Sequence, residues 1–257
     1  MTLTTPAIRA SESNHWYTRD GVPMYTVEAK KGGQRNTTLR DARTMNLVPS
    51  VTTILSVAAK PALTAWLQQQ VLLAALTLPR RTDEPEKEYV DRIINDSKEQ
   101  GRSAADAGTD IHASIQGFYE DKPTGKHQES VIACTQAIDD HFGTRVWVSE
   151  RSFAHDLGFG GKCDLFSGKW DGGIVIDIKT KEFTDPTKVD GYDEHLMQLS
   201  AYRVGLGIPE ARAANVFVSR NVPNLVVVRE WSAEDLDRGW EMFVHLLQFW
   251  QLKHSHK

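Results

Sequence analysis

Residues 158–181 read GFGGKCDLFSGKWDGGIVIDIKTK, and this stretch decides the fold. Two apolar runs meet at the turn-rich segment 167–173, a pattern that predicts an antiparallel β-hairpin. Side chains alternate between the two faces of a strand, so the second run sends its isoleucines to one face: Ile174, Ile176 and Ile178. The opposite face then carries Asp177 and Lys179 beside each other. One face of this strand is core, and the other offers a carboxylate and an ammonium group.

The turn of the hairpin decides whether Asp164, on the first strand, joins these groups. A two-residue loop puts Asp164 opposite Asp177 or Lys179, and the polar groups converge on one patch. That loop is centred on Trp170–Asp171 or on Asp171–Gly172. A three-residue loop would pair Asp164 with an isoleucine and scatter the polar groups.

Carboxylates brought close together repel each other unless a divalent cation lies between them, and oxygen ligands suit Mg²⁺ or Mn²⁺. A lysine at the edge of such a site can hold a phosphate oxygen or activate a water, as metal-assisted phosphodiester hydrolysis requires. The alternative is a solvated ion pair between Asp177 and Lys179. The same acid-any-Lys pattern also begins at Glu28, Asp96 and Glu120, but only at Asp177 does it follow directly on a β-branched run.

Asp164 followed by Asp177-Ile178-Lys179 resembles the signature of the PD-(D/E)xK nuclease superfamily, with aspartate as the second acid. Three further matches resemble its RecB-like exonuclease branch: Gly108-Thr109-Asp110-Ile111-His112, Gly160-Gly161, and Gln198-x-x-x-Tyr202. The segment 48–55 also resembles the start of the mitochondrial genome maintenance exonuclease group and its phage relatives. Together the matches run from about residue 48 to residue 202, in the order of the family.

The resemblance implies an α/β (mixed) fold: a restriction-endonuclease-like core with a central mixed sheet flanked by helices, plus an N-terminal helical elaboration. We expect a disordered segment at 1–12 and a single nuclease domain at 13–257. Within that domain, 13–100 would form an N-terminal hairpin and a helical arch, and 101–257 the catalytic core.

The resemblance also assigns roles to individual residues. A metal ion, Mg²⁺ or Mn²⁺ as one or two ions, would be held by His112, Asp164, Asp177 and the backbone carbonyl of Ile178. Lys179 would act in catalysis with Asp164 and Asp177, and DNA would contact Thr180, Gln198 and Tyr202. In isolation, His112 is an ordinary packed or surface histidine, and Gln198 and Tyr202 could simply bond to each other.

Three further residues keep two interpretations. Glu150 either acts at the metal, as a ligand or as a group that supports the ligands, or is a solvated strand residue. Ser50 and Thr52 are either capping residues of a helix N-terminus or DNA-binding residues that contact a phosphate, since in the resembling family this region would guide a single strand past the active site. Ala104, Gly108 and His112 recur every four residues, which predicts a stripe of small side chains where another backbone approaches closely.

The remaining pattern predicts the other elements. The expected helices begin at Ser50 and Pro61 and cover 83–121, 131–141, 194–205 and the segment after Ser232. The expected strands cover 146–153, 215–220 and 225–231, with a hairpin at 15–27 and a polar loop at 30–43.

Composition narrows the cofactors and partners. The chain has 257 residues, a net charge of −4 and two cysteines, too few for the four-cysteine iron–sulfur cluster of some RecB-like enzymes. A Walker A motif is absent, so we expect no nucleotide cofactor. No apolar run suits a membrane span or signal segment, and we expect a cytoplasmic protein of a bacterial or phage-infected cell rather than a mitochondrial one.

The resulting hypothesis is a metal-dependent DNA exonuclease that acts on single-stranded ends, with DNA and recombination or replication proteins as partners. One alternative is a structure-specific or restriction-type endonuclease, which would use the same site. The other is a nuclease-fold module that binds DNA or scaffolds a complex without cutting.

Overall fold

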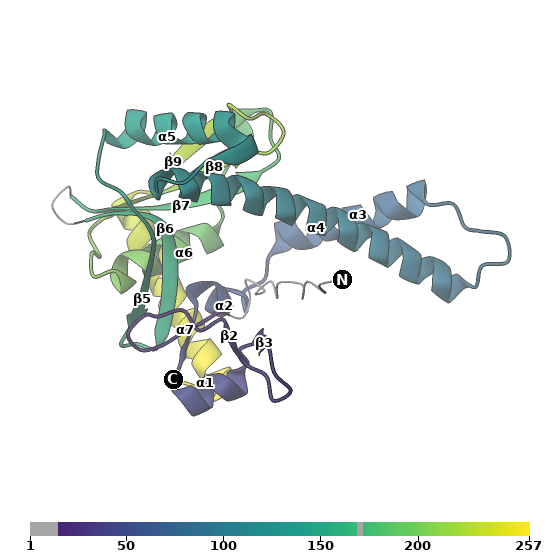
Figure 1. Cartoon of the computed structure of the whole chain (residues 1–257), viewed down its shortest axis with the longest axis horizontal. Coiled ribbons are helices and arrows are strands. Elements are labelled where there is room, and N and C mark those ends of the chain that lie inside the picture. Colours follow the sequence, from purple (N-terminus) through teal and green to yellow (C-terminus); the bar gives the residue numbers. More distant parts are fainter. Residues whose placement is uncertain (1–14, 169–171) are drawn as a thin grey trace.

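A computed structural model describes residues 15–168 and 172–257, the side chains of Gln100 and Ala104 excepted. Its centre is a five-stranded mixed sheet with the order β5-β6-β7-β8-β9. The pair β7–β8 is parallel and the other neighbours are antiparallel. The strands are β5 (Val148–His155), β6 (Phe159–Ser167), β7 (Ile174–Lys181), β8 (Arg212–Ser219) and β9 (Val226–Glu230). The predicted fold class, a mixed sheet flanked by helices, is confirmed (Figure 1).

The β6–β7 hairpin has one of the registers that the sequence allowed. Ser167 pairs with Ile174 and Leu165 pairs with Ile176, which matches a loop centred on Trp170–Asp171. Residues 169–171 themselves lie outside the described part of the chain. One position further along this register, Asp164 lies across from Asp177.

Helices cover both faces of the sheet (Figure 1). The isoleucines of β7 pack with α4 (Glu86–Tyr119) and α5 (Gln128–Phe142) in one core cluster. Val175 belongs to a second cluster with α6 (Asp193–Gly205) and α7 (Ala233–His254). The parallel crossover from β7 to β8 passes through α6, and burial on both faces explains why β7 reads as an almost continuous apolar run.

Helix starts follow the capping residues in the sequence. The Ser50 side chain accepts a hydrogen bond from Thr53 N at the start of α2 (Val51–Leu55), and Ser232 caps α7 in the same way. Pro61 occupies the first turn of α3 (Pro61–Thr77). Short 3₁₀ turns lie at η2 (Gly125–His127) and η4 (Pro186–Lys188).

The antiparallel helices α3 and α4 form an arm that projects from the body (Figure 1). Helix α4 is continuous from Glu86 to Tyr119, so one helix crosses the boundary that the sequence suggested between residues 100 and 101. Helix α3 has no charged residue, and several of its apolar side chains are exposed, among them Leu67, Leu72 and Leu76. None of the helices in the described ranges has the length and apolar character needed to cross a membrane.

The N-terminal segment differs from the prediction. The expected hairpin over 15–27 is confirmed only in its inner part: a tight turn forms at residues 18–22, Tyr17 bridges to Pro23, and Met24 N donates to Trp16 O. Strand β1 (Trp16–Tyr17) pairs with β4 (Val48–Pro49). Such two-residue strands carry too little pattern to be recognised in a sequence.

The expected loop at 30–43 is also wrong in part. It contains β3 (Gln34–Asn36), which pairs with β2 (Thr26–Glu28), and most of α1 (Leu39–Met45). A capping box between Thr38 and Asp41 starts α1. The disorder predicted for residues 1–12 falls outside the described residues.

Candidate active site

Asp164 lies where the strands of the hairpin separate. The β6–β7 ladder reaches Leu165 and Ile176, one position before the aspartates. Beyond it, Asp164 Oδ2 accepts a hydrogen bond of 2.6 Å from the backbone N–H of Ile178. In a regular ladder a main-chain carbonyl of β6 would accept such a bond. Here the Asp164 carboxylate accepts it, and the bond fixes this carboxylate beside β7.

His112 reaches this carboxylate from α4. Its Nε2 lies 3.1 Å from Asp164 Oδ2. Helix α4 can approach β7 this closely because residue 108 is glycine, and a Cβ at that position would overlap Thr180 Oγ1 of β7. The negative charge of Asp164 raises the pKa of His112 to about 9, against the effect of burial. Burial pushes the pKa of Asp164 upward, but the His112 and Lys179 charges outweigh it and hold that pKa below its ordinary value.

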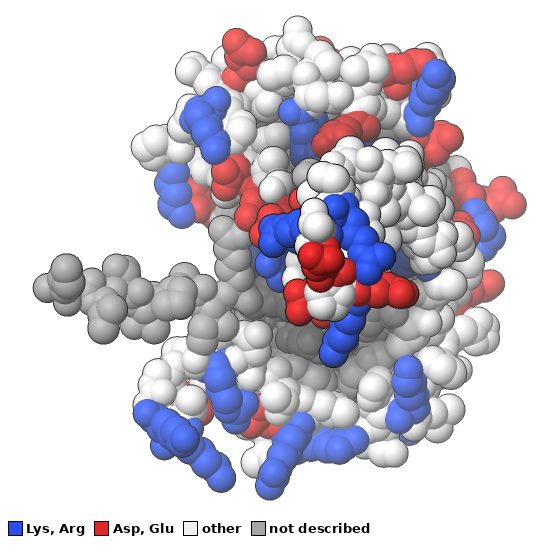
Figure 2. Space-filling view, turned by 90° about the vertical axis from the view of Figure 1, so that its right-hand side faces the viewer, with Lys and Arg blue, Asp and Glu red and all other residues white. Residues whose placement is uncertain are grey.

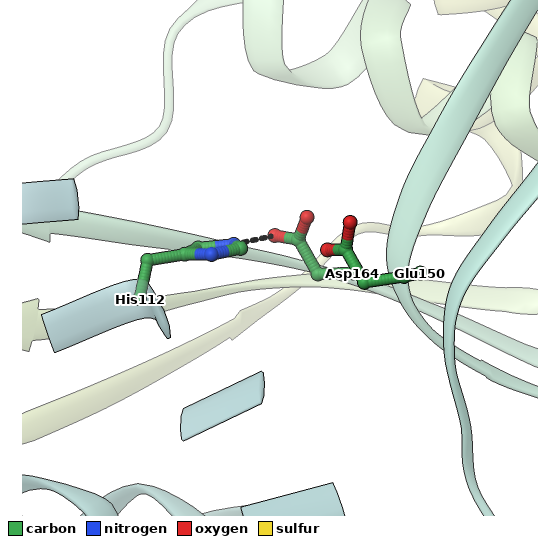
Figure 3. Close-up of side chains that lie close together, drawn as sticks. All are labelled: His112, Glu150 and Asp164. Carbon is green, nitrogen blue, oxygen red and sulfur yellow. Dashed lines mark ion pairs between the residues drawn. The ribbon is translucent and has the colours of Figure 1, made fainter. Parts of the chain in front are cut away.

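Glu150 completes a group with these two residues. The ligand atoms of His112, Glu150 and Asp164 all lie within 4.8 Å of one another, and the three side chains point toward a common space (Figure 3). Glu150 has a φ of +54°, in the left-handed region, and the β5–β6 pairing runs through Ser149 and Arg151 but not through Glu150. Its carboxylate forms an ion pair with Lys162.

Asp177 lies in a separate network under α6. Its Oδ1 accepts hydrogen bonds of 2.9 Å from Lys179 Nζ and 2.9 Å from Gln198 Nε2, and its Oδ2 accepts one of 2.8 Å from Asn215 Nδ2. Gln198 Nε2 also donates to the Tyr202 hydroxyl, 2.9 Å away. Only 2% of Asp177 is exposed, and burial raises its pKa to about 6, although Lys179 opposes the shift.

A cleft of about 570 Å³ contains all of the site residues that the sequence singled out. Its walls include the acids, the histidine and the lysine, together with Ser50, Thr52, Ile178, Thr180, Gln198 and Tyr202. Ser50 is 3% exposed and serves as a helix cap, and its hydroxyl also bonds to Thr52 Oγ1 at 2.9 Å. The sequence grouped Asp177 with Asp164 and His112, whereas the metal-compatible group among the described residues has Glu150 in that place.

Sequence reasoning missed several residues of this cleft. Arg220, directly after β8, lines the cleft, and Asn215 within β8 is a buried partner of Asp177. They come 43 and 38 residues after Asp177 in the chain, so only the parallel β7–β8 pairing brings them near. His15 also lines the cleft, next to β1, whose pairing with β4 no pattern revealed, and its ring stacks on Tyr25.

The chemistry of the group His112, Glu150 and Asp164 fits a divalent cation. One imidazole nitrogen and two carboxylates form a hard, anionic ligand set that suits Mn²⁺ or Mg²⁺, with room for further ligands from the cleft. His112 would have to give up its Nε2 proton, so cation binding should release a proton.

No protein-family model matches the chain, and no curated protein sequence matches it either. Solved structures do align with it. The crystal structure of SSO0001 aligns with a TM-score of 0.32 and 16% identity, over 72% of this chain and 86% of that chain. An alkaline exonuclease, LHK-Exo from Laribacter hongkongensis, aligns with a TM-score of 0.38 and 11% identity, over 81% and 93%. Likenesses this distant carry no argument about function, which therefore rests on the residues of the cleft.

Proposed function

We propose that this chain is a metal-dependent deoxyribonuclease of the RecB-like branch of the PD-(D/E)xK superfamily, acting as an exonuclease on single-stranded ends. One observation carries the proposal: the ligand group His112, Glu150 and Asp164 shares a single cleft with the Asp177–Lys179 pair. The family resemblance of the sequence names those same residues, apart from leaving the role of Glu150 open.

The proposed chemistry is hydrolysis of a phosphodiester bond. A divalent cation held by His112, Glu150 and Asp164 would supply charge neutralisation at the phosphate and a more acidic water. Lys179 lies at the same cleft, where its ammonium group can hold a phosphate oxygen or the attacking water.

Asp177 and Gln198 position that lysine. Lys179 Nζ donates to Asp177 Oδ1 at 2.9 Å and to Gln198 Oε1 at 3.2 Å, which restricts the long side chain to one side of the cleft. Asp177 would enter the coordination of the cation only by exchanging one of its present hydrogen bonds. Thr180 and Tyr202, at the cleft wall, are the proposed contacts to the DNA backbone.

Digestion of end-labelled DNA tests the proposal. The purified chain is incubated with linear single strands, linear duplex and covalently closed circles, in Mg²⁺, in Mn²⁺ and in EDTA. We expect the single strands to shorten from an end in either metal, the circles to survive, and EDTA to stop the reaction. Cutting of the circles would instead identify an endonuclease, and no cutting of any substrate would favour the binding module.

Matched variants assign the activity to the cleft. Lys179→Ala and Asp164→Asn should each lower the cleavage rate by about 10²-fold or more, as loss of a charge-stabilising group typically does. Asp110→Asn is the control, because Asp110 lies on α4 two residues from His112 but is 53% exposed and pairs with Lys126. Full activity of Lys179→Ala would reject the mechanism.

A further inference from the structure

Two aromatic rings from the N-terminal segment face the candidate active site. The rings of His15 and Tyr25 stack with their centroids 4.1 Å apart and their planes at 19°, and both residues line the cleft that contains His112 and Lys179. The pair is fixed from behind, because the Tyr25 hydroxyl bonds to the Tyr17 hydroxyl at 2.8 Å and Tyr17 is only 2% exposed. The cleft therefore has a fixed aromatic wall in addition to its charged residues.

The backbone also holds both rings in place. His15 O accepts a hydrogen bond of 2.9 Å from Ser50 N, and Tyr25 O accepts one of 2.9 Å from Thr37 N. Ser50 and Thr37 are themselves buried, at 3% and 2% exposure. An aromatic surface that is ordered before a ligand arrives loses little conformational entropy when the ligand binds.

A basic strip begins shortly after Tyr25 in the sequence. We use this name for Lys30, Lys31, Arg35, Arg40 and Arg43, which are all exposed on the β2–β3 pair and α1. Figure 2 shows Lys and Arg side chains gathered on the lower part of the molecule, below the arm, where these elements lie. The chain as a whole has a net charge of −4, so this local excess is not a property of the average surface.

Part of the strip is occupied by internal contacts. Arg35 forms a bidentate pair with Asp41, at 2.6 and 2.7 Å, and Arg43 donates to the backbone oxygen of His254. Lys30 and Lys31 lie at the tip of the β2–β3 pair and extend into solvent. They are the groups best placed to meet a polyanion.

We propose that the aromatic wall and the basic strip together bind single-stranded nucleic acid: one base stacks on the His15–Tyr25 pair while phosphates lie along Lys30 and Lys31. This inference rests on the proposed function and names the residues that would bind its single-stranded substrate. A π-face beside a cationic track is what unpaired bases and their backbone require, whereas the bases of a duplex already have both faces stacked.

Fluorescence anisotropy with a labelled 12-nucleotide oligo(dT) in EDTA tests this without cleavage. Tyr25→Ala should weaken binding about 5- to 100-fold, the range for loss of one base–aromatic stack, and Tyr25→Phe should stay within about twofold of the wild type. An oligonucleotide of abasic residues should bind weakly to the wild type and lose nothing further on Tyr25→Ala. Phe118→Ala is the control, since Phe118 is 47% exposed near the C-terminal end of α4 and does not line the cleft.

The strip is tested by the salt dependence of the same binding. Lys30→Ala/Lys31→Ala should lower the slope of log affinity against log salt by about 1.4, because each lost phosphate contact on a single strand is worth about 0.7. Lys188→Ala, an 82% exposed lysine paired with Asp185, should leave the slope unchanged. These surface variants keep the test decisive even if Tyr25→Ala does not fold.

Three results would overturn the inference. Tyr25→Phe could weaken oligo(dT) binding as strongly as Tyr25→Ala, or the double lysine variant could keep the salt slope of the wild type. The third is that Tyr25→Ala weakens binding of a blunt duplex as much as binding of the single strand. The outcome is separate from that of the proposed function. Binding losses with no cleavage by the wild type would reject the nuclease and keep this site, whereas cleavage with unaltered binding would do the reverse.

Discussion

Replacing Gly108 by alanine tests how the α4–β7 contact delivers His112 to the site. A Cβ at this position would overlap Thr180 Oγ1 and stand 3.6 Å from Thr180 Cβ. The overlap falls well inside the roughly 3.5 Å at which nonbonded atoms attract each other. Either Thr180 leaves its rotamer or α4 moves outward, and His112 is one helical turn further along the same face.

The matched substitution is Gly101→Ala on the same helix. There the nearest atoms to an added Cβ are the Trp66 ring carbons, at 3.8 and 3.9 Å, an ordinary contact distance. Alanine in a helix interior is favoured over glycine by about 1 kcal/mol, and both variants gain this term. Overpacking costs about 1–3 kcal/mol and applies only at position 108. The difference between the two free energies of unfolding should therefore be about 1–3 kcal/mol, with Gly101→Ala the more stable.

Urea unfolding gives the two stabilities, and calorimetric titration with Mn²⁺ gives the consequence for the site. Ligand distances in metal sites are held to within about 0.2 Å, so a shifted His112 should lower the affinity of Gly108→Ala at least tenfold. Adding Thr180→Ala should restore both quantities, measured as a double-mutant cycle against Thr180→Ala alone. Equal stability changes in the two glycine variants, with equal Mn²⁺ affinity, would refute the reasoning.

Three shorter predictions follow. Asn215→Ala removes a buried donor to Asp177 and should destabilise the fold by about 2–3 kcal/mol in urea unfolding; a change below about 0.5 kcal/mol would show that the bond is dispensable. Burial, reinforced by nearby lysines, lowers the pKa of His195 from 6.5 to about 3, so the unfolded chain binds more protons below pH 6.5 and stability falls as the pH drops. Urea midpoints at pH 7.5 and 5 should therefore differ more for the wild type than for His195→Gln. An equal difference in the two proteins would count against His195 as the cause of the pH dependence. Lys162→Met removes the cation paired with Glu150 and should raise Mn²⁺ affinity about tenfold by calorimetry without nucleic acid; weaker binding would argue against Glu150 as a ligand.

The parts of the fold that the sequence predicted are those set by local rules. Ser50, Ser232 and Pro61 act within one helical turn, so their helices begin where capping chemistry puts them. The β6–β7 hairpin also depends on neighbours in the chain, and period-two alternation combined with a two-residue loop sends Asp164 and Asp177 toward one cleft. Such features need no knowledge of what lies on the other side of the sheet.

The parts that could not be predicted depend on distant pairings. Asn215 reaches Asp177 because β8 runs parallel to β7 with Asp177 opposite Asn215, a register produced by the α6 crossover. The pairing of β1 with β4 brings His15 to the cleft in the same way. A polar residue at the start of an apolar strand gives no sign of its partner, so these contacts have to be seen in three dimensions.

Glu150 shows why local reasoning left the ligand set open. A glutamate on a strand with ordinary dihedrals would alternate with its neighbours, and its face would follow from the pattern. Its φ of +54° departs from those dihedrals, and non-glycine residues in this region cost of order 1 kcal/mol or more. The β5–β6 register is the same on both sides of Glu150, so Glu150 lies across from Asp164, and its carboxylate joins His112 and Asp164 within 4.8 Å. A strand that only had to support the sheet would gain stability by relaxing this residue, so the strain is best explained by the position that it gives to the carboxylate.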